Sequence, residues 1–407
     1  QNRKVGCKVR PACHVVMGAN CVASTSIGCL FCYTGCNAEK VRNAFTFIPP
    51  PPSYSIAQDP QNKDRFKIVY LMEGLLGSPM YAHAADISQV HRVTTANDNR
   101  IPVVWVKCGP RGESTSAASS AEQPPLVLLH CHGNATDIGM MMGPYYELAE
   151  VLGIDVVGVE YSGYGTATGT PSSGNTYADM EAAYDLVKSL GVPPSRIVAY
   201  GQSVGSGPVA CLAAKRQLGG IILHSPLLSG IKVVDPRPDR CCRPSCVWHC
   251  FDFYPNGRRI QNVSCPVFIM HGQQDDIIPF YHGVQLHKDC PASSRWPAYF
   301  PADAGHNDLV ETDIRAYFSE VSGFLNGLAP VTQSPEQIHM AALSGNACAS
   351  SGCGMAEPKA GPEDGRYEQF RQGTVCMPAG LRRQQPMEGS LQPDTTCGLP
   401  PNVVADA

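Results

Sequence analysis

The sequence predicts an α/β protein in which helices cover both faces of a mostly parallel β-sheet. Short apolar runs bounded by turn residues recur between residues 125 and 272, and they have the length and composition of buried strands. Segments with apolar residues at helical spacing lie between them. Strands that alternate with helices form βαβ units, whose strands are parallel. The 407 residues suffice for one such domain with extensions.

The predicted elements follow a regular order. An antiparallel strand comes first, at 101–108, and a Ser/Ala-rich loop follows it at 113–123. Buried parallel strands and the helices between them come next. The predicted strands are 125–133, 155–163, 196–203, 220–226 and 266–272, and the predicted helices are 177–190 and 206–218.

Composition divides the chain into four parts. Residues 1–48 hold six cysteines within the first 36 positions, and six basic residues against one acidic residue give them a net charge of +5. A proline linker occupies 49–53. The predicted α/β domain covers 54–328. Residues 329–407 are rich in Gly, Pro, Gln and Ser without a sustained apolar period, which predicts a disordered tail.

Charge and cysteine content narrow the class of protein. The formal net charge is −4 and the charged fraction is 16%, so no basic excess points to nucleic acid. No run of 18 uncharged apolar residues predicts a spanning helix. The 19 cysteines are odd in number and clustered, which favours a cytosolic protein with free or lipid-modified thiols over a disulfide framework. A signal peptide at 14–33 is the alternative.

The segment 201–205 reads Gly-Gln-Ser-Val-Gly and fits the G-x-S-x-G pattern. It stands between a predicted strand and a predicted helix, which is the setting of a nucleophile elbow. The glycines are needed because the turn is too sharp for flanking Cβ atoms. The alternative is a Gly-rich turn with an N-capping serine. Ser203 is therefore the candidate nucleophile, and the predicted fold is the α/β-hydrolase fold.

A serine hydroxyl needs a base to take its proton, and the base needs an orienting acid. In this fold the chain order is Ser, then Asp or Glu, then His. Asp275 follows the strand at 266–272, and His306 follows a later apolar run, so both fit. Asp276 competes with Asp275 for the role of the acid. The remaining nearby candidates are expected to be structural: Asp303 and Asp308 as loop residues, and His130, His132, His224 and His271 as hydrogen-bonded core histidines.

The oxyanion hole should combine two backbone N–H groups. One belongs to the residue after the nucleophile, Val204, and the other to the loop after an earlier strand. The segment "HGNA" (132–135) supplies that loop, with Asn134 as the expected donor. An ordinary strand–helix turn is the alternative for this segment.

Several motifs resemble the α/β-hydrolase-domain-17 subfamily. They are "FIPPPPSYSI", "HGNATDIG", "YSGYGTATGTPS", "YGQSVGSGP", "LHSPLLSG", "CFDFYPN", "HGQQDD" and "GHND", and their order is preserved over residues 28–326. The resemblance implies a membrane-tethered thioesterase with Ser203, Asp275 and His306 in the triad positions. Its substrates would be S-acylated, membrane-associated proteins, and its place the cytoplasmic face of the plasma membrane or endosomes. No cofactor is implied.

The chain departs from that subfamily in three segments: the extension before Cys29, the Cys-rich loop at 235–250 and the tail after Pro330. These departures bear on substrate class rather than on hydrolase chemistry. A lipase, esterase or peptidase acting on another acyl group is one alternative, and a non-catalytic scaffold of the same fold is another.

The cysteines at 29, 32 and 36 lie beside apolar residues within the basic N-terminal segment. Cys29, Cys32 and Cys36 lack a nearby fourth ligand for zinc, so no metal is expected there. Acylation fits better, because two or more acyl chains anchor a protein stably at a membrane. The group Cys241–Cys250, with His249, could hold zinc, carry acyl groups or remain free, and the sequence does not choose among these.

Overall fold

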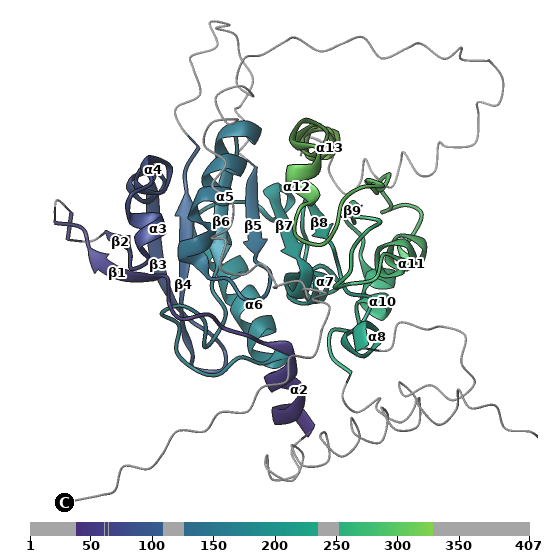
Figure 1. The fold of residues 1–407 in the computed structure, drawn as a ribbon, viewed down its shortest axis with the longest axis horizontal. Coiled ribbons are helices and arrows are strands. Elements are labelled where there is room, and N and C mark those ends of the chain that lie inside the picture. The colour runs from purple at the N-terminus through teal and green to yellow at the C-terminus, as the bar shows by residue number, and fades with distance from the viewer. Residues whose placement is uncertain (1–37, 61, 64, 109–125, 235–251, 329–407) are drawn as a thin grey trace, which may run out of the picture. The chain divides into compact units, whose positions relative to one another are not determined.

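The computed structural model describes residues 38–60, 62, 63, 65–108, 126–234 and 252–328. A seven-stranded sheet in this part of the chain has the order β3-β4-β6-β5-β7-β8-β9, and β1 and β2 form a separate antiparallel pair (Figure 1). The strands are β1 (Tyr54–Gln58), β2 (Phe66–Tyr70), β3 (Ser88–Thr94), β4 (Arg100–Val106), β5 (Val127–Cys131), β6 (Asp155–Val159), β7 (Ile197–Gln202), β8 (Gly220–His224) and β9 (Val267–Met270).

The sheet is antiparallel at one edge and parallel elsewhere. Strand β4 pairs antiparallel with both β3 and β6, whereas β6, β5, β7, β8 and β9 run parallel. Beyond β9, Arg295 and Tyr299 add only isolated parallel bridges. This is the α/β-hydrolase fold, which confirms the predicted class. The predicted antiparallel strand at 101–108 is confirmed as β4, but it is not the first strand, because β1, β2 and β3 precede it. The carboxyl ends of the parallel strands meet at one edge, where sites in such sheets form.

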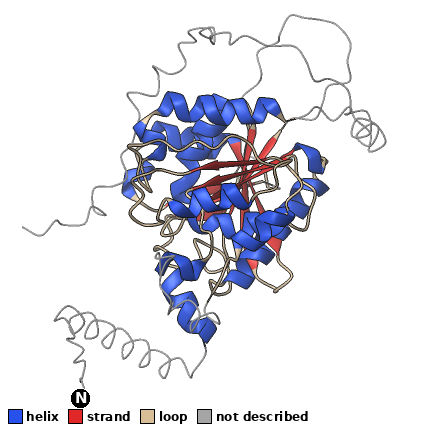
Figure 2. Cartoon of the chain, turned by 90° about the vertical axis from the view of Figure 1, so that its right-hand side faces the viewer, coloured by secondary structure: helices blue, strands red, loops and turns tan. Residues whose placement is uncertain are grey.

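Helices cover both faces of the sheet (Figure 2). On one face, Tyr145 of α5 (Ile138–Leu152) lies against Gly158 of β6, and Phe324 of α13 (Ile314–Gly327) stacks on Phe268 of β9 at 5.4 Å. On the other face lie α6 (Ser173–Ser189) and α7 (Ser206–Ala213). The other helices are α2 (Ala38–Thr46), α3 (Glu73–Leu76), α4 (Pro79–Ile87), α8 (Gly230–Val234), α10 (Asn256–Arg259), α11 (Tyr281–Asp289) and α12 (Leu309–Thr312).

The two helical layers explain why the strands read as continuous apolar runs. Every residue of β5, β6 and β8 is buried, because neither face of these strands reaches solvent. The predicted strands are longer than the observed ones, since their last residues form the loops that carry the site. Helix α6 begins earlier than predicted because the Ser172 side chain caps it, accepting from the Asn175 N–H at 3.0 Å.

Candidate active site

Ser203 lies at a strained turn at the carboxyl end of β7. Its φ is +51°, a left-handed value that costs a non-glycine residue about 1–3 kcal/mol. A Cβ atom on Gly201 would lie 2.6 Å from the Gly205 carbonyl oxygen, and one on Gly205 would lie 2.4 Å from the Cys131 carbonyl oxygen. Both glycines are therefore required by close backbone approach. The turn has the geometry expected of a nucleophile elbow.

Three side chains from separate loops form a continuous hydrogen-bonded chain. The Nε2 atom of His306 lies 3.0 Å from the Ser203 hydroxyl oxygen, and its Nδ1 atom lies 2.7 Å from Oδ2 of Asp275. His306 and Asp275 are both buried. Nucleophile, base and acid thus have the mutual contacts of a Ser-His-Asp triad. The structure brings together the three residues that the sequence indicated.

Asp275 is distinguished from its neighbour by its surroundings. Its Oδ1 atom accepts from the N–H groups of Ile277 at 3.0 Å and Ile278 at 2.7 Å, whereas the Asp276 side chain is exposed. Burial alone would raise the pKa of Asp275, but hydrogen bonds from His271 and His306 outweigh it and lower this pKa below its ordinary value. Asp275 therefore stays ionised beside the base.

The structure places His271 on the acid, a contact that sequence reasoning missed. Its Nε2 atom lies 3.1 Å from Oδ2 of Asp275 and 2.8 Å from the Ile278 carbonyl oxygen. Because that carbonyl can only accept, Nε2 carries the hydrogen. The i, i+4 spacing of His271 and Asp275 after β9 was the available signal.

The other flanking residues remain outside the triad. His224 is buried at the end of β8, and burial, followed by the nearby His306 and His271, lowers its pKa to about 3, so its ring is neutral. Asp308 accepts from the Gly305 N–H at 2.6 Å and thereby shapes the loop that carries His306, as expected. Asp303 is exposed.

The loop after β5 adjoins the elbow. A Cβ atom on Gly133 would lie 3.7 Å from the side chain of Gln202, the residue before the nucleophile. Asn134 follows Gly133, and Val204 is buried directly after Ser203. The expected oxyanion donors thus belong to two adjacent segments at the carboxyl ends of β5 and β7.

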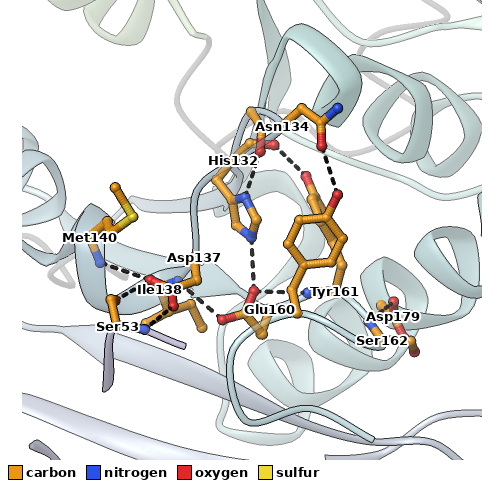
Figure 3. Close-up of polar contacts among 12 residues, drawn as sticks. Ser53, His132, Asn134, Asp137, Ile138, Met140, Glu160, Tyr161, Ser162 and Asp179 are labelled. Carbon is orange, nitrogen blue, oxygen red and sulfur yellow. Dashed lines mark hydrogen bonds and ion pairs between the residues drawn. The ribbon is translucent and has the colours of Figure 1, made fainter. Parts of the chain in front are cut away.

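The Asn134 side chain ties this loop to the start of the described chain. Its Oδ1 atom accepts from the Tyr164 hydroxyl at 2.7 Å (Figure 3). The same atom accepts from the Ile48 N–H at 3.0 Å. Its Nδ2 atom donates to the Thr46 carbonyl oxygen at 2.6 Å. Phe47, which lies between Thr46 and Ile48 in the sequence, is buried and packs edge-to-face on Tyr254. The end of α2 and the residues after it are therefore bound directly to the candidate oxyanion loop.

The remaining candidates concern cysteines and membranes. Cys29, Cys32, Cys36 and the Cys241–Cys250 group lie outside the described residues. The described cysteines are free, and no cluster of three or more His, Cys, Asp or Glu side chains in these ranges could hold a metal ion. Within the same ranges, no helix combines the length and apolar character needed to cross a membrane.

Comparisons with known proteins give relatives over most of the chain, although no protein-family model matches it. The chain is 34% identical over 324 residues to alpha/beta hydrolase domain-containing protein aho-3 of Caenorhabditis elegans, covering 78% of this chain and 89% of the relative. It is 33% identical over 293 residues to human alpha/beta hydrolase domain-containing protein 17B, covering 71% and 92%. Among solved structures, Pyrococcus furiosus esterase Pf2001 aligns with a TM-score of 0.48 and 14% identity, over 69% of this chain and 97% of the esterase.

Proposed function

Because the chain belongs to the α/β-hydrolase-domain-17 family, we propose that it is a serine hydrolase that removes long acyl chains from cysteine thioesters. The observation that carries the chemistry is the hydrogen-bonded chain from Ser203 through His306 to Asp275. Its substrates are proposed to be S-acylated proteins at the cytoplasmic face of the plasma membrane or endosomes, as the resemblance of its motifs implies.

Acylation begins when His306 accepts the Ser203 proton and the serine oxygen bonds to the thioester carbonyl carbon. Asp275 holds the His306 ring and stabilises the imidazolium that forms. The N–H groups of Val204 and Asn134 are the proposed donors to the negative oxygen of the tetrahedral intermediate. Collapse of the intermediate breaks the C–S bond and releases a thiolate. An unperturbed thiol has a pKa near 8.5, so this leaving group needs little help from an acid.

Deacylation repeats the same steps with water. His306 transfers its extra proton to the departing thiolate or to solvent and then takes a proton from the attacking water. The water oxygen bonds to the acyl carbon, and breakage of the bond to Ser203 releases the fatty acid. Serine recovers its proton from His306. The base therefore acts twice in each turnover, on Ser203 and on water.

Two exposed apolar side chains support an acyl or membrane-borne substrate. Ile48 is 59% exposed and its N–H is bound by Asn134, whereas Ile277 is 49% exposed and its N–H is bound by Asp275. Their backbones therefore lie beside the candidate oxyanion loop and beside the acid. Acylation of Cys29, Cys32 and Cys36 is proposed to hold this face near the bilayer.

The test compares matched palmitoyl thioester, oxyester and amide substrates, with Ser203→Ala as the control. We expect the thioester to have the highest kcat/KM and Ser203→Ala to lose both turnover and fluorophosphonate labelling. Preference for the oxyester or the amide would assign the site to an esterase or a peptidase. A wild-type protein that does not label would identify a non-catalytic scaffold.

A further inference from the structure

His132 lies between the candidate oxyanion loop and a buried acid. It is the first residue after β5, and its side chain is fully buried. The Nδ1 atom lies 2.8 Å from the carbonyl oxygen of Gly133, and the Nε2 atom lies 3.0 Å from Oε1 of Glu160 (Figure 3). Both ring nitrogens are therefore engaged, unlike those of a histidine that only fills space.

The contact with Gly133 matters because of peptide geometry. A carbonyl oxygen can only accept, so Nδ1 donates a hydrogen to it. The Gly133 carbonyl and the Asn134 N–H belong to one planar trans peptide, in which C=O and N–H point in opposite directions. A hydrogen bond that fixes the Gly133 oxygen thereby fixes the direction of the Asn134 N–H. That N–H is the proposed second oxyanion donor.

Glu160 in turn fixes the ring. It follows β6 and is fully buried, and its two oxygens are surrounded by donors. Oε2 accepts from the Tyr54 hydroxyl at 2.8 Å and the Ile138 N–H at 3.1 Å, and Oε1 accepts from the Tyr161 N–H at 3.3 Å. Because Nδ1 of His132 already carries a hydrogen, the contact between Nε2 and Oε1 needs a second one, which either the ring or the carboxyl group supplies. This contact fixes the ring and leaves Nδ1 facing Gly133.

The backbone of His132 is held as well. The Tyr161 hydroxyl donates to the His132 carbonyl oxygen at 2.6 Å, and the two rings lie 4.2 Å apart. On the far side of the Gly133–Asn134 peptide, the Asn134 side chain is bound by Ile48, Tyr164 and Thr46. The peptide is therefore clamped at both ends before any substrate binds.

We propose that His132, oriented by Glu160, is a positioning residue that aims the Asn134 N–H at the carbonyl oxygen of the bound acyl group. The inference rests on the proposed hydrolase chemistry but not on thioester specificity. Pre-organised donors stabilise an oxyanion more than donors that must reorient during reaction. A loss of His132 should therefore lower kcat more than it raises KM.

The test uses two variants that each keep one half of the contact. His132→Asn places an amide nitrogen where Nδ1 lies and can still donate to Gly133, but it does not reach Glu160. His132→Gln places its amide nitrogen near the Nε2 position and keeps a partner for Glu160, but it leaves the Gly133 carbonyl without a donor. His130→Leu is the matched control, because His130 is also buried, lies in β5 two residues before His132, and has no hydrogen-bond partner for its Nδ1 among the described residues.

Turnover of an activated oxyester is measured per active site, with sites counted by complete fluorophosphonate labelling. We expect His132→Gln to lose kcat on the order of 10²-fold, as a misplaced catalytic group does, while His132→Asn retains most of it. Thermal stability should follow the opposite order, since Gln keeps the Glu160 partner. Affinity for a trifluoromethyl ketone, which forms a serine-bound oxyanion, should fall in proportion to kcat/KM. His130→Leu should keep its kcat.

A purely structural histidine would make activity follow stability, with the Gln variant at least as active as the Asn variant. That order, or full kcat in the Gln variant, would overturn the proposal. If the Asn variant fails to fold, the comparison of wild type with Gln still decides between the two outcomes. Hydrolysis of the oxyester without the thioester would refute the proposed specificity and leave this test intact.

Discussion

The Nε2 atom of His271 lies 3.1 Å from Oδ2 of Asp275, the same carboxylate oxygen to which His306 is bound. One oxygen therefore serves two histidines. His271 is fully buried, and the hydrogen on its Nε2 atom is shared between this oxygen and the Ile278 carbonyl oxygen. The acid is thus held by His271, directly after β9, as well as by the backbone N–H groups of its own loop.

Removal of His271 should leave Asp275 with one hydrogen-bond donor fewer and hold its carboxylate less firmly against His306. His271→Leu should lower kcat/KM by about 10-fold, an effect of the size of one lost hydrogen bond to a charged group. His271→Gln, which can place a donor near the Nε2 position, should recover part of the loss. Steady-state kinetics of both variants against wild type measure this. Equal losses in Leu and Gln would show that the contact itself does not matter.

The same substitution should change how stability depends on pH. The folded-state pKa of Asp275 is lowered, so the ionised carboxylate stabilises the folded protein above the unfolded-state pKa of about 4. This stabilisation is lost progressively as the pH falls below that value toward the folded-state pKa. His271→Leu removes part of this gain. The stability difference between wild type and variant should therefore shrink below about pH 4 in urea titrations. A constant difference across pH would contradict the assignment.

Asp275→Asn should impair catalysis far more than Asp276→Asn. An amide in place of the acid favours the wrong tautomer of His306, which costs about 10⁴-fold in a related triad. The Asp276 side chain is exposed, so its variant should remain close to wild type. Thioester hydrolysis by the two variants tests this, and a reversed ranking would move the acid to Asp276.

Asp179 gives a pH prediction of the opposite sign. Burial raises its pKa to about 7, although two hydrogen bonds from Ser162 partly offset this. The folded state therefore holds a proton that the unfolded state has released, and stability falls as the pH rises from about 4 to about 7. Asp179→Asn should lack this dependence and gain stability relative to wild type toward pH 7. Parallel pH slopes for the two proteins would refute the raised pKa.

Replacement of Cys29, Cys32 and Cys36 by Ser should release most of the protein from membranes while the purified hydrolase stays active. Basic residues contribute on the order of 1 kcal/mol each at an anionic surface, and salt screens them. Each buried methylene of an acyl chain contributes about 0.8 kcal/mol, so lipid should dominate retention. Single variants should be released less, because two chains still anchor. The measurement is fractionation of the triple and the single variants with acyl exchange, and membrane retention of an unacylated triple variant would shift attention to residues 1–28.

The elbow and the order of the triad could be predicted from the sequence because local geometry requires them. Only glycine fits at positions 201 and 205, and the loops after successive parallel strands meet at one edge of the sheet. Asp275 and Asp276 could not be separated on the same grounds, because adjacent carboxylates differ only in which one the fold buries.

The supporting contacts were not predicted, although the four-residue spacing of His271 and Asp275 was a signal for one of them. The sequence treats His130, His132, His224 and His271 alike, as core histidines near strand ends. Their difference depends on which oxygens the fold brings to each ring: those of Glu160 and the adjacent Gly133 for His132, and those of Asp275 and Ile278 in the following loop for His271. The sequence analysis expected all four to be structural. It therefore missed that His132 contacts the candidate oxyanion loop and that His271 contacts the catalytic acid.

The hydrogen bonds of Thr46 and Ile48 to Asn134 limit how far the candidate active site can lie from the proposed acylation site at Cys36. Thr46 lies ten positions after Cys36, and the last nine of these positions form α2, a helix about 14 Å long that ends at Thr46. An acyl group on Cys36 would therefore hold the nucleophile within roughly a few nanometres of the lipid headgroups, because the connecting segment is short. Such an enzyme would meet its targets by lateral diffusion in the plane of the bilayer. Selection would then depend on how far a modified cysteine stands from the membrane, and little on the residues around it.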